Sequence, residues 1–185
     1  MSRKQRGREE GITLVEISVA LGVIGLIAAI AIPSYISMIP HMALKNGASE
    51  LSMLFTESKM RSVAEMKYFR VVFDLTDDTR QLERGSVVFD AGSGTNIIQW
   101  SVEEPAEKIS PRVDIHADTS DAAVPPFSGD TVIFRPDGSS DAAGFEAVYL
   151  RNTPATGERY RVKVLGATGK IGVERWAGGG WSKAF

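Results

Sequence analysis

The stretch that decides the fold is Gly11-Ile-Thr-Leu-Val-Glu-Ile-Ser-Val-Ala-Leu-Gly-Val-Ile-Gly-Leu-Ile-Ala-Ala-Ile-Ala-Ile32. No Asp, Glu, Lys or Arg occurs from Ile17 to Leu44, and the apolar side chains leave no polar face on a helix. The 21 residues of 12–32 would form a helix about 31 Å long at ~1.5 Å per residue. Because a bilayer has a hydrocarbon core of roughly 30 Å, the stretch predicts a transmembrane helix.

The segment in front of this helix is basic. Residues 1–11 contain four basic and two acidic side chains, a net charge of +2, namely Arg3, Lys4, Arg6 and Arg8 against Glu9 and Glu10. A basic flank keeps its end of an apolar helix in the cytoplasm. We therefore expect a single-pass inner-membrane protein with a cytoplasmic N-terminus and a periplasmic head.

Two other interpretations apply to parts of this region. Ala29-Ile-Ala31 offers a small-x-small site for ordinary signal cleavage, which would release a soluble periplasmic protein that begins at Ile32. The long apolar stretch and the carboxylate of Glu16 at its start argue against such a signal. Glu16 also has a purely local interpretation, because Thr13-Leu-Val-Glu16 fits the capping box that closes a helix N-terminus.

The combination of a charged leader, Gly11-Ile-Thr-Leu-Val-Glu16 and about twenty apolar residues resembles the class III signal of type IV pilins and pseudopilins. The resemblance implies that a membrane prepilin peptidase cuts between Gly11 and Ile12, and that the amine of Ile12 is then N-methylated. It also implies that Glu16, the fifth mature residue, is needed for assembly. The chain has Ile12 where family members often have Phe.

Cleavage in front of the helix has a physical consequence. It leaves the helix on the product and creates an α-amino group, with an ordinary pKa near ~8, at the tip of the helix. An unpaired buried charge costs several kcal/mol in order of magnitude. Glu16 is the acid closest to the apolar segment, so pairing of its carboxylate with the amine of a neighbouring subunit would favour one axial register.

The helix is predicted to continue beyond the membrane segment. We expect one helix over residues 13–64, with a transmembrane half at 12–32 and an amphipathic half at 33–65, bent at Pro33 and Pro40. Apolar residues at helical spacing form the predicted contact stripe with the head, namely Leu44, Ala48, Leu51 and Phe55, continued by Val63 and Met66.

The remainder, residues 66–185, is predicted to be a β-rich head. Alternating or β-branched runs occur at 69–75, 85–89, 96–102, 131–134, 145–151, 160–165 and 170–176, with a possible short strand at 112–116. Residues 103–130 otherwise look like a loop, and the Gly-rich tail 177–185 is expected to be flexible apart from its aromatic residues. The predicted fold class is therefore α+β, a long N-terminal helix on an antiparallel, pilin-like head.

Two motifs in the head resemble the GspH/FimT type of minor pilin or pseudopilin: the turn Phe134-Arg-Pro-Asp-Gly138 and a closing hairpin around Gly169-Lys-Ile-Gly-Val173. The resemblance implies a low-abundance subunit of a type II secretion pseudopilus or a type IV pilus, near the tip. Its implied partners are other pilins or pseudopilins, the prepilin peptidase and an inner-membrane assembly platform.

The sequence offers no catalytic constellation and no cofactor site. It has no Cys, and its two His residues, His41 and His116, lie 75 positions apart with no evident partner. Asp137 and Asp141 flank a Gly-Ser-rich turn and could approach Ca²⁺. That ion needs six to eight oxygen ligands, so we expect two solvated carboxylates and no metal.

A basic stripe supports an alternative function. Residues 151–175 carry a net charge of +4, whereas residues 12–150 carry −9. Arg159, Arg161 and Lys163 alternate along one strand and so share a face. With Lys170, they could contact phosphates, as in a DNA-binding minor pilin of a DNA-uptake pilus. A solvated strand face is the simpler interpretation, and the sequence favours a structural, non-enzymatic pilin-like subunit.

Overall fold

The computed structural model describes residues 13–116, 124–152, 157–177 and 179–185. The predicted cleavage site, Gly11 and Ile12, therefore lies outside the described residues. The chain divides into two compact units, Met1–Ile39 and Pro40–Phe185, and we describe each by itself.

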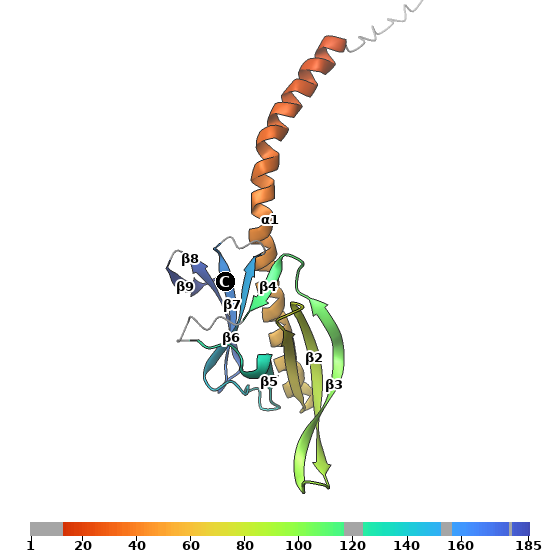
Figure 1. The fold of residues 1–185 in the computed structure, drawn as a ribbon, viewed down its shortest axis with the longest axis vertical. Helices are drawn as coiled ribbons and strands as arrows, with labels where there is room; N and C mark the ends of the chain where they lie inside the picture. The colour runs from red at the N-terminus through yellow and green to blue at the C-terminus, as the bar shows by residue number, and fades with distance from the viewer. Residues whose placement is uncertain (1–12, 117–123, 153–156, 178) are drawn as a thin grey trace, which may run out of the picture. The chain divides into compact units, whose positions relative to one another are not determined.

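The architecture is one long helix followed by antiparallel strands, which confirms the predicted α+β fold class (Figure 1). In chain order the elements are α1 (Leu14–Glu65), β1 (Tyr68–Asp74), β2 (Thr79–Asp90), β3 (Thr95–Lys108), β4 (Val113–His116), the 3₁₀ turn η1 (Ser128–Asp130), β5 (Thr131–Phe134), β6 (Phe145–Asn152), β7 (Arg159–Leu165), β8 (Lys170–Ala177) and β9 (Gly180–Lys183). The alternating runs of the sequence match most strands to within a residue at each end, but β2 begins at Thr79 and β3 ends at Lys108, both outside the predicted runs 85–89 and 96–102.

The strands of the second unit form two sheets. One has four strands in the order β3-β2-β1-β5, and the other has five in the order β4-β6-β7-β8-β9. All neighbouring strands in both sheets pair antiparallel. Hairpins between consecutive strands account for most of these pairs, as the Gly-containing turns of the sequence predict.

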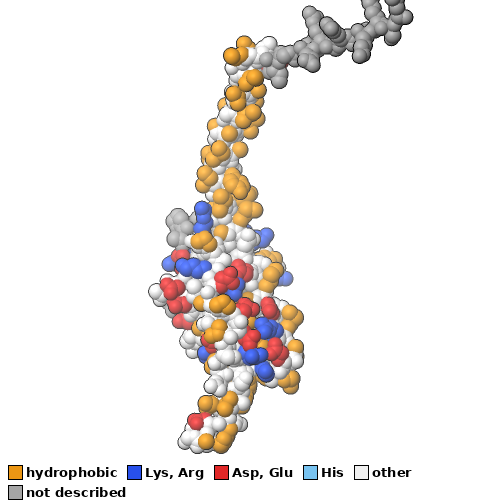
Figure 2. Space-filling model, turned by 90° about the vertical axis from the view of Figure 1, so that its right-hand side faces the viewer, with side chains coloured by type: hydrophobic (Ala, Val, Ile, Leu, Met, Phe, Trp, Pro, Cys, Tyr) orange, Lys and Arg blue, Asp and Glu red, His pale blue; other side chains and the backbone are white. Residues whose placement is uncertain are grey.

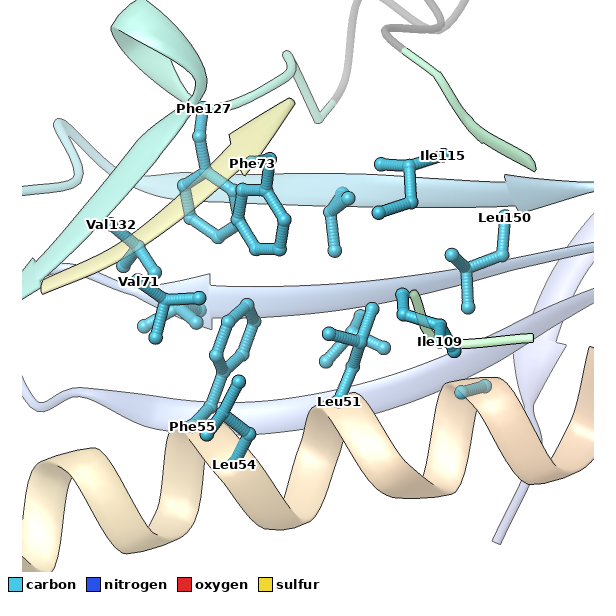
Figure 3. Close-up of a cluster of buried hydrophobic side chains, with 14 of the residues drawn as sticks. Leu51, Leu54, Phe55, Val71, Phe73, Ile109, Ile115, Phe127, Val132 and Leu150 are labelled. Atoms are coloured by element: carbon cyan, nitrogen blue, oxygen red, sulfur yellow. The ribbon is translucent and has the colours of Figure 1, made fainter. Parts of the chain in front are cut away.

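The core forms where residues 40–65 of α1 pack against the inner faces of the sheets (Figure 3). The predicted stripe is buried: Leu44, Ala48, Leu51 and Phe55 are fully inaccessible to solvent. The ring of Phe55 lies at its centre, with its centroid 6.0 Å from that of Phe73 and 5.9 Å from that of Phe127. Edge-on contacts of this kind add to the roughly 1.5–3 kcal/mol that burial of a large apolar side chain contributes.

The predicted continuation of this stripe was wrong. Val63 is 46% exposed and Met66 is 72% exposed. Ser58 and Ser62 take the buried positions, because Ser58 lies three residues after Phe55 and Ser62 four residues after Ser58, which keeps all three on the same helix face. The Ser62 hydroxyl donates to the backbone oxygen of Arg135 at 3.0 Å, so this end of the contact is polar.

Two segments expected to lack regular structure are strands. β3 continues to Lys108, and Pro105 is tolerated there because β3 is an edge strand. Shifts of register in the pairing with β2, on either side of Leu82, accompany this extension. In the tail, β9 pairs with β8, and Trp181 lies opposite Trp176 in the register. Aromatic packing thus orders part of a Gly-rich segment that composition alone marks as flexible.

Candidate functional site

The first unit presents an apolar helical surface that no described residue covers. α1 is long and apolar enough to cross a membrane, by length and composition. Its large apolar side chains before Pro33 are all exposed, namely Leu14, Val15, Ile17, Val19, Leu21, Val23, Ile24, Leu26, Ile27, Ile30 and Ile32. Figure 2 shows such side chains along the visible face of this segment.

The two halves of α1 thus differ in what they contact. No described residue of α1 before Leu44 is buried, whereas eight residues from Leu44 to Ser62 are. An apolar surface left in water costs about 25 cal/mol per Å², so the first half requires lipid or other apolar helices around it. Gly22 and Gly25 lie in this half with open space where a Cβ would be, which permits close approach of a second helix.

Glu16 forms the predicted capping box. Its Oε2 accepts hydrogen bonds from the backbone N–H and the hydroxyl of Thr13, both at 3.3 Å. In return the backbone N–H of Glu16 donates to Thr13 Oγ1 at 3.2 Å. These long hydrogen bonds at an exposed helix end occupy one oxygen of the Glu16 carboxylate. The role of Glu16 in assembly stays a prediction.

The two proline positions lie inside the helix. α1 continues through both Pro33 and Pro40. Each proline removes one N–H donor from the helical hydrogen bonds, which is the physical basis for expecting a bend, and the bends stay predictions.

The two head motifs lie together against the C-terminal end of α1. An added Cβ at Gly169 would collide with the carbonyl oxygen of Gly138, so the two turns are in direct backbone contact. Both glycines have positive φ, 57° and 79° respectively. Lys59 of α1 donates from Nζ to the backbone oxygen of Thr168 at 2.8 Å. The motifs therefore fix the five-stranded sheet to the helix and to β5.

Two residues of the basic stripe share one carboxylate within the sheet. Arg161 is only 6% exposed, and its guanidinium pairs with Glu174 at 2.7 Å. Lys163 pairs with the other oxygen of Glu174 at 2.5 Å. Burial alone would raise the pKa of Glu174, but hydrogen bonds from Lys163 and Arg161 outweigh it and lower that pKa.

Only two residues of the proposed phosphate contact remain exposed, Arg159 and Lys170. The ring of Trp181 also covers Arg161, with the guanidinium carbon 4.3 Å from the ring centroid. The sequence could not show this compensation, because Glu174 lies on the next strand. The nucleic-acid contact stays a prediction.

The candidate calcium ligands, Asp137 and Asp141, each accept a hydrogen bond from a nearby backbone N–H. Asp137 accepts from the N–H and the hydroxyl of Ser139, and these hydrogen bonds lower its pKa. Asp141 accepts from the N–H of Ile133 at 2.8 Å, while burial raises its pKa. Among the described residues, no group of three or more His, Cys, Asp or Glu side chains could hold a metal ion.

Both histidines have partners that sequence inspection did not identify. His41 of α1 contacts Glu158, which also lies 3.7 Å from Arg175. The ring of His116 lies 6.0 Å from that of Tyr149. These contacts join segments far apart in the sequence, so no pattern among neighbouring residues could predict them.

A second feature missed from the sequence is a network of Arg and Glu side chains between α1 and the β2–β3 hairpin. It contains six carboxylates and three guanidiniums, Glu50, Glu57, Glu65, Glu103, Glu104 and Glu107 with Arg61, Arg80 and Arg84. We call this group the Glu–Arg network. Its carboxylates exceed its guanidiniums by three.

No protein-family model matches this chain, and no curated protein matches it. Among solved structures, the chain is similar to the minor pseudopilin EpsH from the type 2 secretion system of Vibrio cholerae. The similarity has a TM-score of 0.45 and 11% sequence identity, and it covers 70% of this chain and 94% of that one. That neighbour is a protein of the class that the N-terminal motif resembles.

Proposed function

We propose that this chain is a structural, pilin-like subunit, a minor pseudopilin or minor pilin, that assembles through the first half of α1. The observation that carries the proposal is the division of one helix into two environments. Residues 44–62 bury a stripe in the head, while residues 14–32 expose apolar side chains on every side. A helix of this kind serves as an anchor first in lipid and then among the helices of a filament.

In this proposal, the residues at the start of the helix are processed first and then pair with a neighbouring subunit. Prepilin peptidase cleaves after Gly11, the amine of Ile12 is methylated, and the head lies in the periplasm. Glu16 then exchanges its local bonds with Thr13 for the charged amine of a neighbouring subunit. Because those local bonds are 3.3 Å long, little is lost in the exchange, whereas an unpaired amine would be costly.

The proposal implies that the chain performs no turnover chemistry of its own. Its partners are other pilin-like subunits, the peptidase and an inner-membrane assembly platform. A type II secretion pseudopilus or a type IV pilus are the assemblies that such a subunit would enter.

Co-expression with a prepilin peptidase tests this proposal. We expect the full chain to lose residues 1–11 only when the peptidase is active, as read from the intact mass of the membrane fraction. Gly11→Leu should block the conversion, and Gly7→Leu, in the same leader, should not. Conversion without the peptidase, or equal conversion of both variants, would contradict the proposal.

A further inference from the structure

The β2–β3 hairpin extends past the C-terminal end of α1. Ion pairs place Arg80 beside Glu50 at 2.7 Å and Arg84 beside Glu65, the last helical residue, at 3.9 Å. β2 therefore runs alongside the helix in the same direction. It then continues to Asp90, six residues or about 20 Å at ~3.3 Å per residue. We call residues 85–100 the arm, which projects from the head in Figure 1.

The arm is regular β-structure up to its tip. Its strands keep an unbroken antiparallel register from Gly85 opposite Trp100 to Asp90 opposite Thr95. At the tip, Asp90 accepts hydrogen bonds from the N–H of Gly92 at 3.0 Å and from the hydroxyl of Ser93 at 2.7 Å. The arm therefore presents a preformed surface.

This surface is apolar on both faces. Val87 and Phe89 are 56% and 63% exposed on one face, and Val88 and Ile97 are 40% and 46% exposed on the other. Figure 2 shows apolar side chains gathered on the visible face of the protruding lower end of the molecule. Contiguous exposed apolar side chains of this kind mark an interaction surface.

The edge of the arm is also unprotected. Each sheet has two edge strands, and β4, β5 and β9 have four residues each, whereas β3 has 14. Proteins usually shorten or charge such edges to prevent pairing with another chain. All charged residues of β3 lie in 103–108, and residues 95–102 contain no charge, Pro or Gly. Among the residues that the structure describes, no strand pairs with this outer edge.

A second copy of the chain does not fit this edge. Parallel pairing would place Glu103, Glu104 and Glu107 beside the same residues of the other copy, and like charges repel across strands. Antiparallel pairing would reverse one copy. β3 runs opposite to α1, because Glu103 lies at Arg61 of α1 and Glu107 lies at Arg80, which itself pairs with Glu50 earlier in α1. The two α1 helices would then point in opposite directions, which subunits anchored in one membrane cannot do.

The charges beside the edge indicate the partner. The Glu–Arg network has three more carboxylates than guanidiniums, and Glu107 is its most exposed member, with 70% of its side chain accessible. β3 itself has three carboxylates, Glu103, Glu104 and Glu107, and one cation, Lys108. A strand that adds to β3 therefore fits best when it is uncharged along residues 95–102 and carries Lys or Arg beside Glu104 and Glu107.

We propose that the arm is a docking element to which a different pilin-like subunit adds such an extended, basic-ended segment as a further strand on β3. The inference rests on the proposed function, since it places the chain among other subunits of one assembly. Main-chain hydrogen bonds supply the affinity, and the carboxylates fix the direction of the added strand.

Photo-crosslinking of the full-length chain in its native cells tests the arm. A photoreactive residue at Gln99, on the exposed edge, should link to another pilin-like subunit through a segment that has Lys or Arg at one end. The same residue at Thr131, on the opposite edge strand β5, should give no such product, and one at Ile24 in α1 should link to pilin-like subunits irrespective of the arm.

Substitutions then distinguish strand pairing at the β3 edge from nonspecific hydrophobic binding to the arm. With the photoreactive residue at Gln99, Ile97→Lys should lower the yield about tenfold, because a charge on an edge blocks strand addition. Glu107→Lys should lower it about two- to fivefold, the scale of one cross-strand charge pair. Val88→Lys is the matched comparison, since Val88 faces Ile97 from the inner strand and the change adds a charge to the same face without placing it on the edge strand; it should lower the yield by no more than about twofold, clearly less than Ile97→Lys.

The remaining outcomes overturn the inference in distinguishable ways. A crosslink from Gln99 to a second copy of the chain, or to a protein without a pilin-like helix, would refute the proposed partner. Equal losses of crosslinking yield for Ile97→Lys and Val88→Lys would refute strand pairing at the edge. If Gln99 gave no crosslink while Ile24 did, the docking role of the arm would be refuted and the proposed function would stand. Absence of links at Ile24 as well would refute both.

Discussion

At the residue scale, a few side chains and glycines hold the head together through contacts between distant segments. Glu174 joins Arg161 and Lys163 across two strands. Gly169 allows two turns to touch. These positions differ from the assembly residue Glu16, whose described partner lies three positions away. Changes at the first group should affect stability, and changes at Glu16 should affect assembly.

Glu174 should make stability depend on pH. Its pKa is lowered in the folded protein, so its ion pairs stabilise the head at neutral pH and this contribution is lost as the pH falls through the acidic range below about 4.3. Urea unfolding of the full chain in detergent should show this loss. Glu174→Gln should be less stable at pH 7 by about 1–3 kcal/mol and should lose less on acidification. Glu107→Gln, at an exposed position, is the control, and an identical pH profile for Glu174→Gln and the original chain would contradict the assignment.

Gly169→Ala should destabilise the head more than Gly138→Ala. Both glycines have positive φ, which costs an alanine about 1–2 kcal/mol. Only the Cβ at position 169 would collide with backbone, whereas the one at Gly138 would lie 3.3 Å from a methyl of Val63. We expect about 3 kcal/mol or more for Gly169→Ala, measured by denaturant unfolding. Equal losses would show that the two turns are not in contact.

At the element scale, α1 is the part of the molecule that the sequence predicts best. The absence of charge from Ile17 to Leu44 and the stripe at helical spacing depend only on neighbouring residues, so the buried positions Leu44, Ala48, Leu51 and Phe55 could be predicted from the sequence. The prediction failed at Val63 and Met66, where the last turn meets a turn of the head and Ser62 bonds to Arg135. That partner is 73 residues away, and no local pattern encodes it.

Strand existence was predictable, but strand ends and edges were not. Alternation identified most strands, whereas β3 continues past Pro105 because an edge strand tolerates proline. The Glu–Arg network and the pairing of Arg161 and Lys163 with Glu174 likewise depend on which strands are adjacent. The charge count over residues 151–175 included Glu174 but could not show which basic side chains lie beside it.

Phe55 should be the most costly position of α1 to truncate. Phe55→Ala would remove a fully buried ring that contacts three other aromatic rings, with an expected loss of about 3–5 kcal/mol. Met53→Ala, at a position that is 68% exposed on the same helix, should change stability by less than about 0.5 kcal/mol. Denaturant unfolding of the full chain in detergent provides both values, and similar losses would contradict the observed helix face.

At the scale of the whole molecule, the head carries a net negative charge, and Arg161 and Lys163 of its basic stripe are paired with Glu174. We therefore expect the full chain in detergent to give no salt-dependent gel shift with duplex DNA at low ionic strength. A shift that weakens steeply with salt and is lost in Arg159→Ala would instead support the DNA-uptake alternative. Lys45→Ala, on α1, would serve as the control.

The central claim is that the apolar half of α1 stays on the mature chain as the element that holds it among other subunits. The intact mass of the native protein, isolated separately from the membrane and soluble fractions, tests this most directly. We expect a membrane-associated species that spans residues 12–185 and carries one methyl group on Ile12. A soluble species that begins at Ile32 would contradict the account.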